Sequence, residues 1–227
     1  IKLKKKFDFI VQQYLKLKRI TMVKITALGC MHGHYPELER GDLLILTGDF
    51  TANNSVSAEI SFFMWLKKQK YKKKILISGN HDNEMPKNHK ESEDYIYLCD
   101  SGLEFEGLKI WGSPWSLWFD GINPHCTAFT GTEEDLDKKF SLIPYDIDIL
   151  ITHSPPFGIL DLTARSKQNV GSKALLKQYD RIKPKLHLFS HIHEGWGYRD
   201  KFFTEFFNCS IMNEDYEAIN EPFDIEI

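Results

Sequence analysis

Five short apolar runs along this chain each end in residues that can bind a metal ion. The runs are Val23–Leu28, Leu43–Thr47, Ile75–Ile77, Ile149–Thr152 and Leu186–Phe189. The polar stretches at their ends are Cys30-Met31-His32, Gly48-Asp49, Gly79-Asn80-His81-Asp82, His153 and Ser190-His191-Ile192-His193. Continuous apolar runs are typical of strands that are covered on both faces. Because sites in α/β sheets form at the carboxyl ends of strands, the pattern predicts one metal site assembled from distant parts of the chain.

The segments between and after these runs indicate the rest of the fold. Helices are expected over Ser55–Lys70, Glu133–Leu142 and Ser172–Arg181. An antiparallel hairpin is expected around the turn Glu106-Gly107, and closing strands over Phe202–Phe207 and Ala218–Ile227. Alternating strand and helix units followed by antiparallel strands predict an α/β protein with two packed mixed sheets and helices outside. With no repeat or linker, residues 22–227 are expected to form one domain.

Composition and charge argue against several classes of protein. Of the 227 residues, 42% are hydrophobic, which is enough for a substantial core. A net charge of -3 gives no general attraction to polymeric nucleic acid or to an anionic membrane. The four cysteines lack the paired spacing of disulfide-rich secreted domains, and no apolar run approaches the roughly 18 residues that cross a bilayer. We therefore expect a soluble, cytoplasmic protein, and the oligomeric state stays open.

Residues 1–21 differ in composition from the rest of the chain. Seven basic residues stand here against one acid, Asp8, and helical spacing relates Phe7, Ile10, Val11, Tyr14 and Leu17. One interpretation is a basic amphipathic arm that binds a membrane surface or a partner. The other is a non-native leader, because the chain does not begin with Met and Met22 directly precedes the first apolar run.

The residue types in the five stretches suit a pair of metal ions. The carboxylate of Asp49 has two oxygens and can bridge two cations, whereas Asn80 offers a single neutral oxygen. His153, His191 and His193 offer imidazole nitrogens, which suit zinc, iron or manganese. Two cations roughly 3.5–4 Å apart can hold a hydroxide nucleophile for in-line attack on phosphorus.

The order of these stretches resembles the calcineurin-like metallophosphoesterase superfamily. The pattern of that family is Asp-x-His, Gly-Asp, Gly-Asn-His-Asp/Glu, a lone His and Gly-His-x-His. Other stretches resemble the subgroup of metallophosphoesterase-domain-containing proteins, namely Gly41-Asp42-Leu43-Leu44, Gly112-Ser113-Pro114-Trp115 and Ile151-Thr152-His153-Ser154-Pro155-Pro156. The resemblance covers about residues 22 to 213. It implies a four-layer α/β/β/α sandwich and metal-dependent hydrolysis of phosphodiesters or phosphomonoesters.

The resemblance also implies a role for each matching residue. Cys30, His32, Asp49 and His193 would hold the first metal, and Asp49, Asn80, His153 and His191 the second. His81 would contact the phosphate and protonate the leaving oxygen, with Asp82 orienting its ring. Asn80 and His81 would also bind substrate. The histidines without a matching position, which we interpret as surface or core residues, are His34, His89, His125 and His187.

Two residues depart from the pattern of the family. Ser190 replaces a glycine, which a small residue should tolerate. Cys30 replaces the first aspartate, and three interpretations stay open: a thiolate ligand, a weakly held first metal, or a buried thiol that acts as a small apolar residue. Thiolate binds zinc at about 2.3 Å and is a poor ligand for manganese. The other cysteines, Cys99, Cys126 and Cys209, are not expected to be ligands.

The substrate is the least constrained part of the prediction. Trp111, Trp115 and Trp118 are close in sequence, and an aromatic ring near a phosphate site can stack on a nucleobase or simply form a hydrophobic wall. We take Trp115 as the candidate substrate contact. The leading hypothesis is a dinuclear metal-dependent phosphoesterase, specifically a phosphodiesterase that acts on small nucleotides, cyclic ones among them, by attack of a metal-bridging hydroxide on phosphorus. The alternative is a catalytically weak regulatory protein that binds nucleotide or metal, because Cys30 replaces the usual aspartate.

Overall fold

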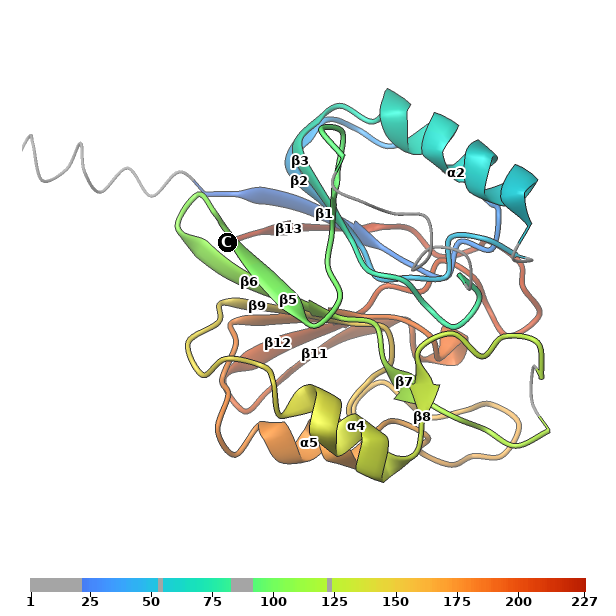
Figure 1. The fold of residues 1–227 in the computed structure, drawn as a ribbon, viewed down its shortest axis with the longest axis vertical. Coiled ribbons are helices and arrows are strands. Elements are labelled where there is room, and N and C mark those ends of the chain that lie inside the picture. The colour runs from blue at the N-terminus through green and yellow to red at the C-terminus, as the bar shows by residue number, and fades with distance from the viewer. Residues whose placement is uncertain (1–21, 53–54, 83–91, 122–123) are drawn as a thin grey trace, which may run out of the picture.

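Two mixed sheets make up the body of the molecule (Figure 1). The computed structural model describes residues 22–52, 55–82, 92–121 and 124–227, so the basic segment 1–21 and His89 lie outside the described residues. The first sheet has the order β13-β1-β2-β3-β4. Its strands are β1 (Lys24–Leu28), β2 (Gly41–Leu46), β3 (Tyr71–Leu76), β4 (Ile96–Tyr97) and β13 (Phe223–Glu226). All neighbours pair in parallel except β13 with β1, so the carboxyl ends of β1, β2 and β3 share one edge.

The second sheet has the order β11-β12-β10-β9-β6-β5. Its strands are β5 (Ser101–Phe105), β6 (Leu108–Ser113), β9 (Ile149–Thr152), β10 (Leu186–Phe189), β11 (Gly197–Lys201) and β12 (Thr204–Asn208). The four central strands are parallel, and an antiparallel strand closes each side. A small parallel pair, β7 (Ser116–Leu117) and β8 (Thr130–Gly131), extends from the carboxyl end of β6.

Helices cover the outer face of each sheet (Figure 1). Helix α2 (Val56–Lys68) lies over the first sheet, and α4 (Glu133–Phe140) and α5 (Lys173–Gln178) lie over the second. Each begins at a capping side chain: Ser55 accepts from Ala58 N–H, Ser172 accepts from Leu175 N–H, and Thr132 forms a capping box with Asp135. These layers confirm the predicted α/β/β/α sandwich. No helix in the described ranges is both long and apolar enough to cross a membrane.

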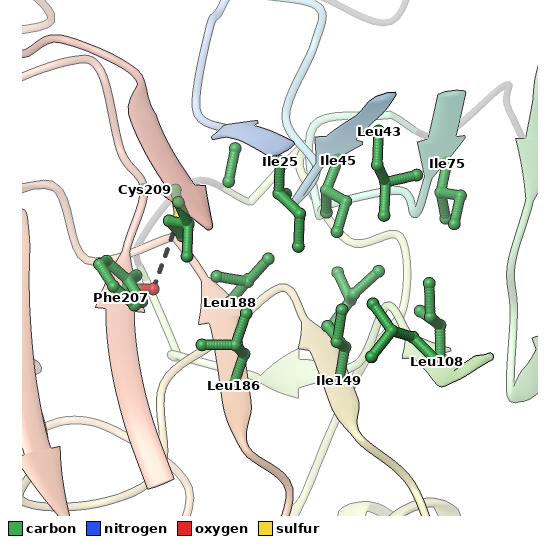
Figure 2. Packing of buried hydrophobic residues seen from close by; sticks show 14 of the residues in the cluster. Ile25, Leu43, Ile45, Ile75, Leu108, Ile149, Leu186, Leu188, Phe207 and Cys209 are labelled. Carbon is green, nitrogen blue, oxygen red and sulfur yellow. Dashed lines mark hydrogen bonds between the residues drawn. The ribbon is translucent and has the colours of Figure 1, made fainter. Parts of the chain in front are cut away.

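Period-2 alternation along the strands explains why two sheets stack. On β2, Leu43 and Ile45 point into the space between the sheets, while Leu44 and Leu46 pack under α2. Figure 2 shows one layer facing the other, with Ile25, Leu43, Ile45 and Ile75 opposite Leu186, Leu188, Ile149 and Leu108. A separate cluster beneath α4 and α5 includes Leu136, Phe140, Leu150 and Leu175. The strands are therefore covered on both faces, as their continuous apolar runs predict.

Two predicted strands differ from those observed. The strand expected over Phe202–Phe207 starts two residues later, as β12 from Thr204 to Asn208; β11 ends at Lys201, and Phe202 and Phe203 form the turn between the two strands with φ of 56° and 65°. Two aromatic residues favoured a strand, but a two-residue hairpin turn requires this left-handed backbone. The strand expected over Ala218–Ile227 is limited to β13, after an isolated bridge between Met212 and Ala218. The turn at Glu106-Gly107 forms as predicted, with φ of 50° and 81°.

Candidate metal centre

The loops after β1, β2, β3, β9 and β10 meet where the carboxyl ends of the two sheets face each other. Hydrogen bonds to main-chain carbonyls join the sheets here. Gly29 N–H donates to the carbonyl of Cys209 at 2.9 Å, and Ser190 Oγ donates to the carbonyl of Thr47 at 3.0 Å. The same carbonyl lies 2.9 Å from Nδ1 of His153. The site is therefore built across the two sheets.

Four of the predicted ligands stand on left-handed backbone. The φ angles are 47° at Cys30, 43° at His32, 58° at Asp49 and 70° at His191. Such conformations cost energy in residues other than glycine and persist only where the surroundings enforce them. Main-chain bonds do so here, because Met31 N–H and His32 N–H both donate to the carbonyl of Asp49, at 2.8 and 3.0 Å. The backbone thus aims these side chains into the site.

Gly48 lets the turn before Asp49 pack tightly. Its φ is 98°, and a Cβ atom there would lie 2.7 Å from Gly79 N and 2.7 Å from His153 Nδ1. Any side chain would push apart the β2, β3 and β9 loops. A glycine before Asp49 is therefore required by the close approach of three ligand-bearing loops.

One group of ligand atoms, which we call the first subsite, comes from Cys30, His32 and His193. These three ligand atoms lie within 4.8 Å of one another. The Nε2 atoms of His32 and His193 are 3.2 Å apart. Nδ1 of His193 lies 2.9 Å from the carbonyl of Asn213, an arrangement in which Nδ1–H donates and Nε2 carries a lone pair. Two ring nitrogens that face each other so closely suit a shared cation.

The second subsite comprises Asp49, Asn80, His153 and His191. Nε2 of His153 lies 3.3 Å from Oδ2 of Asp49 and 3.1 Å from Oδ1 of Asn80. The ligand atoms of Asp49, His153 and His191 lie within 4.8 Å of one another. Oδ2 of Asp49 is also 3.8 Å from Nε2 of His32 in the first subsite. The carboxylate thus stands between the two subsites, where a bridging ligand would be.

Burial keeps most of these histidines in the neutral form that binds metals. It lowers the pKa of His32 to about 3 and lowers the pKa of His191 and His193 as well. Although burial alone would lower the pKa of His153, the carboxylate of Asp49 raises it. The pKa of Asp49 is held well below its usual value, because His153 and the neighbouring histidines outweigh its burial. Burial, with Asp49, raises the pKa of the Cys30 thiol. A thiolate at Cys30 therefore requires a cation beside it.

Asp82 has contacts other than the expected one with the ring of His81. Its carboxylate accepts from the N–H groups of Gly79 at 2.8 Å, Asp49 at 2.7 Å, Phe50 at 3.0 Å and Thr51 at 3.2 Å. Its position next to His81 in the sequence suggests an interaction between the two side chains. In the structure its carboxylate instead connects the β2 loop to the β3 loop. The described hydrogen bonds of Asp82 thus fix the backbone of these loops and do not reach the ring that the residue is predicted to orient.

The ring of His81 lies beside the first subsite. Its centroid is 4.6 Å from that of His32 in an edge-to-face arrangement, and His81 N–H donates to Oδ1 of Asp49 at 2.9 Å. Nδ1 of the ring lies 3.3 Å from Sγ of Cys126, a residue that the sequence analysis did not place in the site. No motif or spacing connects Cys126 with the ligands. Only the tertiary fold could reveal it.

Trp115 packs against the outer layer of the second sheet. Its indole N–H donates to Asp100 at 2.9 Å, its ring meets Phe129 edge to face, and Nζ of Lys139 lies 4.2 Å from the ring centroid. These contacts differ from those expected of a substrate residue. Among the other histidines, His187 is buried between Thr152 and Tyr179 as a core residue, and His34 and His125 are exposed.

Comparisons with known proteins show the family to which the chain is similar. The model of the calcineurin-like phosphoesterase family matches residues 23–195. Metallophosphoesterase domain-containing protein 1 of Homo sapiens is 35% identical over 219 residues, which cover 84% of this chain and 66% of that protein. UPF0046 protein T07D4.2 of Caenorhabditis elegans is 33% identical over 245 residues, which cover 90% and 60% respectively. The chain thus spans about two thirds of the length of these relatives.

The fold is also similar to that of a solved structure. The structure of TT1561 of Thermus thermophilus superposes with a TM-score of 0.59 at 13% identity, covering 82% of this chain and 88% of that one. At this identity the likeness shows the fold alone. The family model, by contrast, matches residues 23–195 and so includes all five loops that carry the predicted ligands, from Cys30 to His193. The chain therefore belongs to the calcineurin-like phosphoesterase family.

Proposed function

We propose that this protein hydrolyses small phosphoesters with two metal ions, one in each subsite. Membership of the family implies metal-dependent phosphoester hydrolysis. The observation that carries the proposal is the place of the Asp49 carboxylate, whose Oδ2 lies 3.3 Å from His153 Nε2 and 3.8 Å from His32 Nε2. A buried carboxylate between two sets of sulfur, nitrogen and oxygen donors suits two cations, since a buried charge needs partners of the opposite sign.

The residues of the chain divide the work of this reaction. The bound ions would supply positive charge on the phosphoryl oxygens and an activated water. Asp49 would hold the two ions together, and Asn80 would complete the second subsite through Oδ1. His81, which lies beside the first subsite but outside the proposed ligands, would give a proton to the leaving oxygen. Asp82 would keep the loops of Asp49 and Asn80 in register through its backbone contacts.

Cys30 is proposed as a thiolate ligand in the first subsite. Its Sγ accepts the N–H of His191 at 3.0 Å and belongs to the same cluster of ligand atoms as His32 and His193. An N–H donor stabilises negative charge on sulfur, which favours the ligand form once a cation is present. Because thiolate prefers zinc or iron to manganese, we propose that the first subsite binds zinc or iron.

Two aromatic rings beside the subsites support a small nucleotide as substrate. The ring of Phe119 is nearly parallel to that of His191, with centroids 6.3 Å apart. The ring of Tyr216 lies 4.9 Å from His32 and 5.0 Å from His193. Either ring would offer a nucleobase an apolar face near the phosphate. We therefore propose phosphodiesters of small nucleotides, including cyclic ones, as the substrate class.

The test combines metal analysis with turnover. Metal-free protein would be titrated with zinc, iron(II) or manganese, and the hydrolysis of bis-p-nitrophenyl phosphate and of cyclic nucleotides would be followed at each ratio. We expect two ions per chain and activity that rises with the second. A protein that binds two ions and a nucleotide but turns over neither substrate would favour the second candidate, a binding protein inactivated by Cys30. A single bound ion would contradict both forms of the dinuclear proposal.

A further inference from the structure

The loop before β8 reaches the site through Cys126. Its carbonyl accepts from Nδ2 of Asn80 at 3.4 Å, and its Sγ lies 3.3 Å from Nδ1 of His81. The two contacts join this loop to a proposed metal ligand and to the proposed acid. They come from the main chain and the side chain of one residue, so they can be tested separately.

We propose that Cys126 is a positioning residue that fixes the ring of His81 so that Nε2 faces the leaving oxygen. The inference rests on the proposed function and deepens it. The backbone of His81 is already fixed by its bond to Asp49 Oδ1 and by the four N–H groups that hold Asp82. What these bonds leave undetermined is the rotation of the His81 ring. The contact between Nδ1 and Sγ determines that rotation.

Asp82, the adjacent carboxylate, does not perform this task in the described structure, because its hydrogen bonds go to the β2 and β3 loops. The edge of the His81 ring against His32 restricts the ring on one side, and Cys126 meets it at a ring nitrogen. Cys126 is half-buried, so the contact is partly shielded from water. A thiol here takes the place that an orienting carboxylate would otherwise fill.

The chemistry of sulfur suits this role. With both ring nitrogens protonated, Nδ1–H donates to Sγ and Nε2–H points to the substrate. As the bond between phosphorus and the leaving oxygen breaks, the proton of Nε2 moves to that oxygen, and Nδ1–H still donates to Sγ. The attacking water releases its proton to solvent as its oxygen bonds to phosphorus, and solvent returns one proton to Nε2, so the protons balance. The ring thus keeps one orientation on both sides of the proton transfer, and only Nε2 exchanges its proton.

The experiment compares two aryl methyl phosphodiesters, one with a p-nitrophenyl and one with a phenyl leaving group. A poor leaving group depends more on the acid, so the phenyl ester is the sensitive substrate. In the metal-loaded protein we expect Cys126→Ala to lower kcat on the phenyl ester by about 3- to 10-fold, the effect of one weak hydrogen bond. The effect on the p-nitrophenyl ester should be smaller. KM and metal content should not change, because the carbonyl contact with Asn80 remains.

Two further variants separate positioning from packing. Cys126→Ser keeps a group that accepts from Nδ1–H and should restore most of the lost rate, whereas Cys126→Val fills the space and should not. Cys99→Ala, at an exposed thiol remote from the ligands, is the control. In a His81→Gln background Cys126→Ala should have no further effect on kcat. An equal loss in that background, or no recovery with serine, would overturn the inference.

The contact can also be measured without turnover. In protein with ¹⁵N-labelled histidine, the chemical shifts of the His81 ring should change between wild type and Cys126→Ala, and those of His187 should not. Unchanged chemical shifts of the His81 ring would overturn the proposed role of Cys126 but would leave the proposed function intact. A wild type that binds two ions but hydrolyses neither ester would instead overturn the proposed function, whatever the ring reports.

Discussion

The two subsites use different chemistry although one site contains both. The first subsite joins a thiol to two histidines whose pKa burial lowers, so its donors are neutral in the absence of a cation. The second subsite is organised by the charge of Asp49, which raises the pKa of His153. The first therefore resembles a site for a soft ion, and the second suits ions that accept oxygen ligands. The difference teaches that one substitution, at Cys30, can make the two halves of the site unequal.

The largest effect is expected from removing the charge that the subsites share. Asp49→Asn retains an oxygen that accepts His81 N–H, and asparagine tolerates left-handed backbone. Without the negative charge both ions should bind weakly, and turnover should fall by about 10⁴-fold or more. Metal analysis and the rate with bis-p-nitrophenyl phosphate measure both losses. Asp42→Asn, at the opposite end of β2, is the control. If Asp49→Asn still binds two ions tightly, the proposal that the charge of Asp49 serves both subsites is contradicted.

The next largest effect is expected from a variant that should impair catalysis without changing metal binding in either subsite. His81→Gln should lower kcat by about 10²–10⁴-fold, the usual contribution of a general acid. Its metal content should equal that of wild type, since His81 is outside both proposed ligand sets. The exposed His34→Gln serves as the matched control. Loss of an ion from His81→Gln would assign this residue to a subsite and leave the reaction without its acid.

His32 of the first subsite and His153 of the second should respond to pH in opposite directions in the metal-free protein. The folded-state pKa of His32, about 3, is below its unfolded value, so its stabilisation is present above pH 6.5 and is lost as pH falls. That loss amounts to ~2 kcal/mol between pH 6.5 and 5. His153 has a raised pKa, so its stabilisation is present at low pH and is lost as pH rises through its folded pKa.

Urea unfolding of chelated protein across this range tests the contrast. Relative to wild type, His32→Gln should lose less stability on acidification, and His153→Gln should lose less as the solution becomes alkaline. Each variant is the control for the other, since both remove one buried imidazole. If His32→Gln and His153→Gln change the pH dependence of stability in the same direction, the opposite pKa shifts assigned to His32 and His153 are wrong.

The smallest expected effect is on metal preference. Cys30→Asp should move the first subsite toward manganese, by about tenfold in the ratio of zinc to manganese affinity. Cys30→Ala should leave one tightly bound ion in the second subsite. Competition between the two ions in equilibrium dialysis gives the ratio, with Cys99→Ala as control. If Cys30→Ala binds two ions as tightly as wild type does, Cys30 is only a packing residue. The proposed chemical difference between the two subsites would then be contradicted.

Features that depend on a local rule could be predicted from the sequence. The five strands that precede the proposed ligands are continuous apolar runs, and His153 follows its run directly while Asp49 follows its run after Gly48, so both the strand and the place of the side chain are local properties. The capping residues Ser55 and Ser172 are local in the same way. The order of the ligand stretches then allowed the whole fold to be inferred from a resemblance.

Features set by distant contacts could not be predicted. Cys126 meets a residue 45 positions away, in a loop with no periodicity, so its sequence neighbours carry no signal of the contact. Asp82 adjoins His81 in the chain, yet its rotamer is determined by the N–H groups of the β2 loop more than 30 residues away. The turn at Phe202 and Phe203 contradicts their propensity because the register of β11 with β12 places the reversal there.

The left-handed loops of the site also bear on how such proteins diverge. The bonds that maintain the loops at Cys30 and His32 run between peptide groups, for example from Cys30 N–H to the carbonyl of Gly48 at 2.9 Å. Every amino acid except proline carries the same peptide groups, so the loop keeps its path when its side chain is replaced. Aspartate and cysteine can therefore alternate at position 30 through a single substitution. The metal used by a descendant could then change with one residue while the scaffold stays the same.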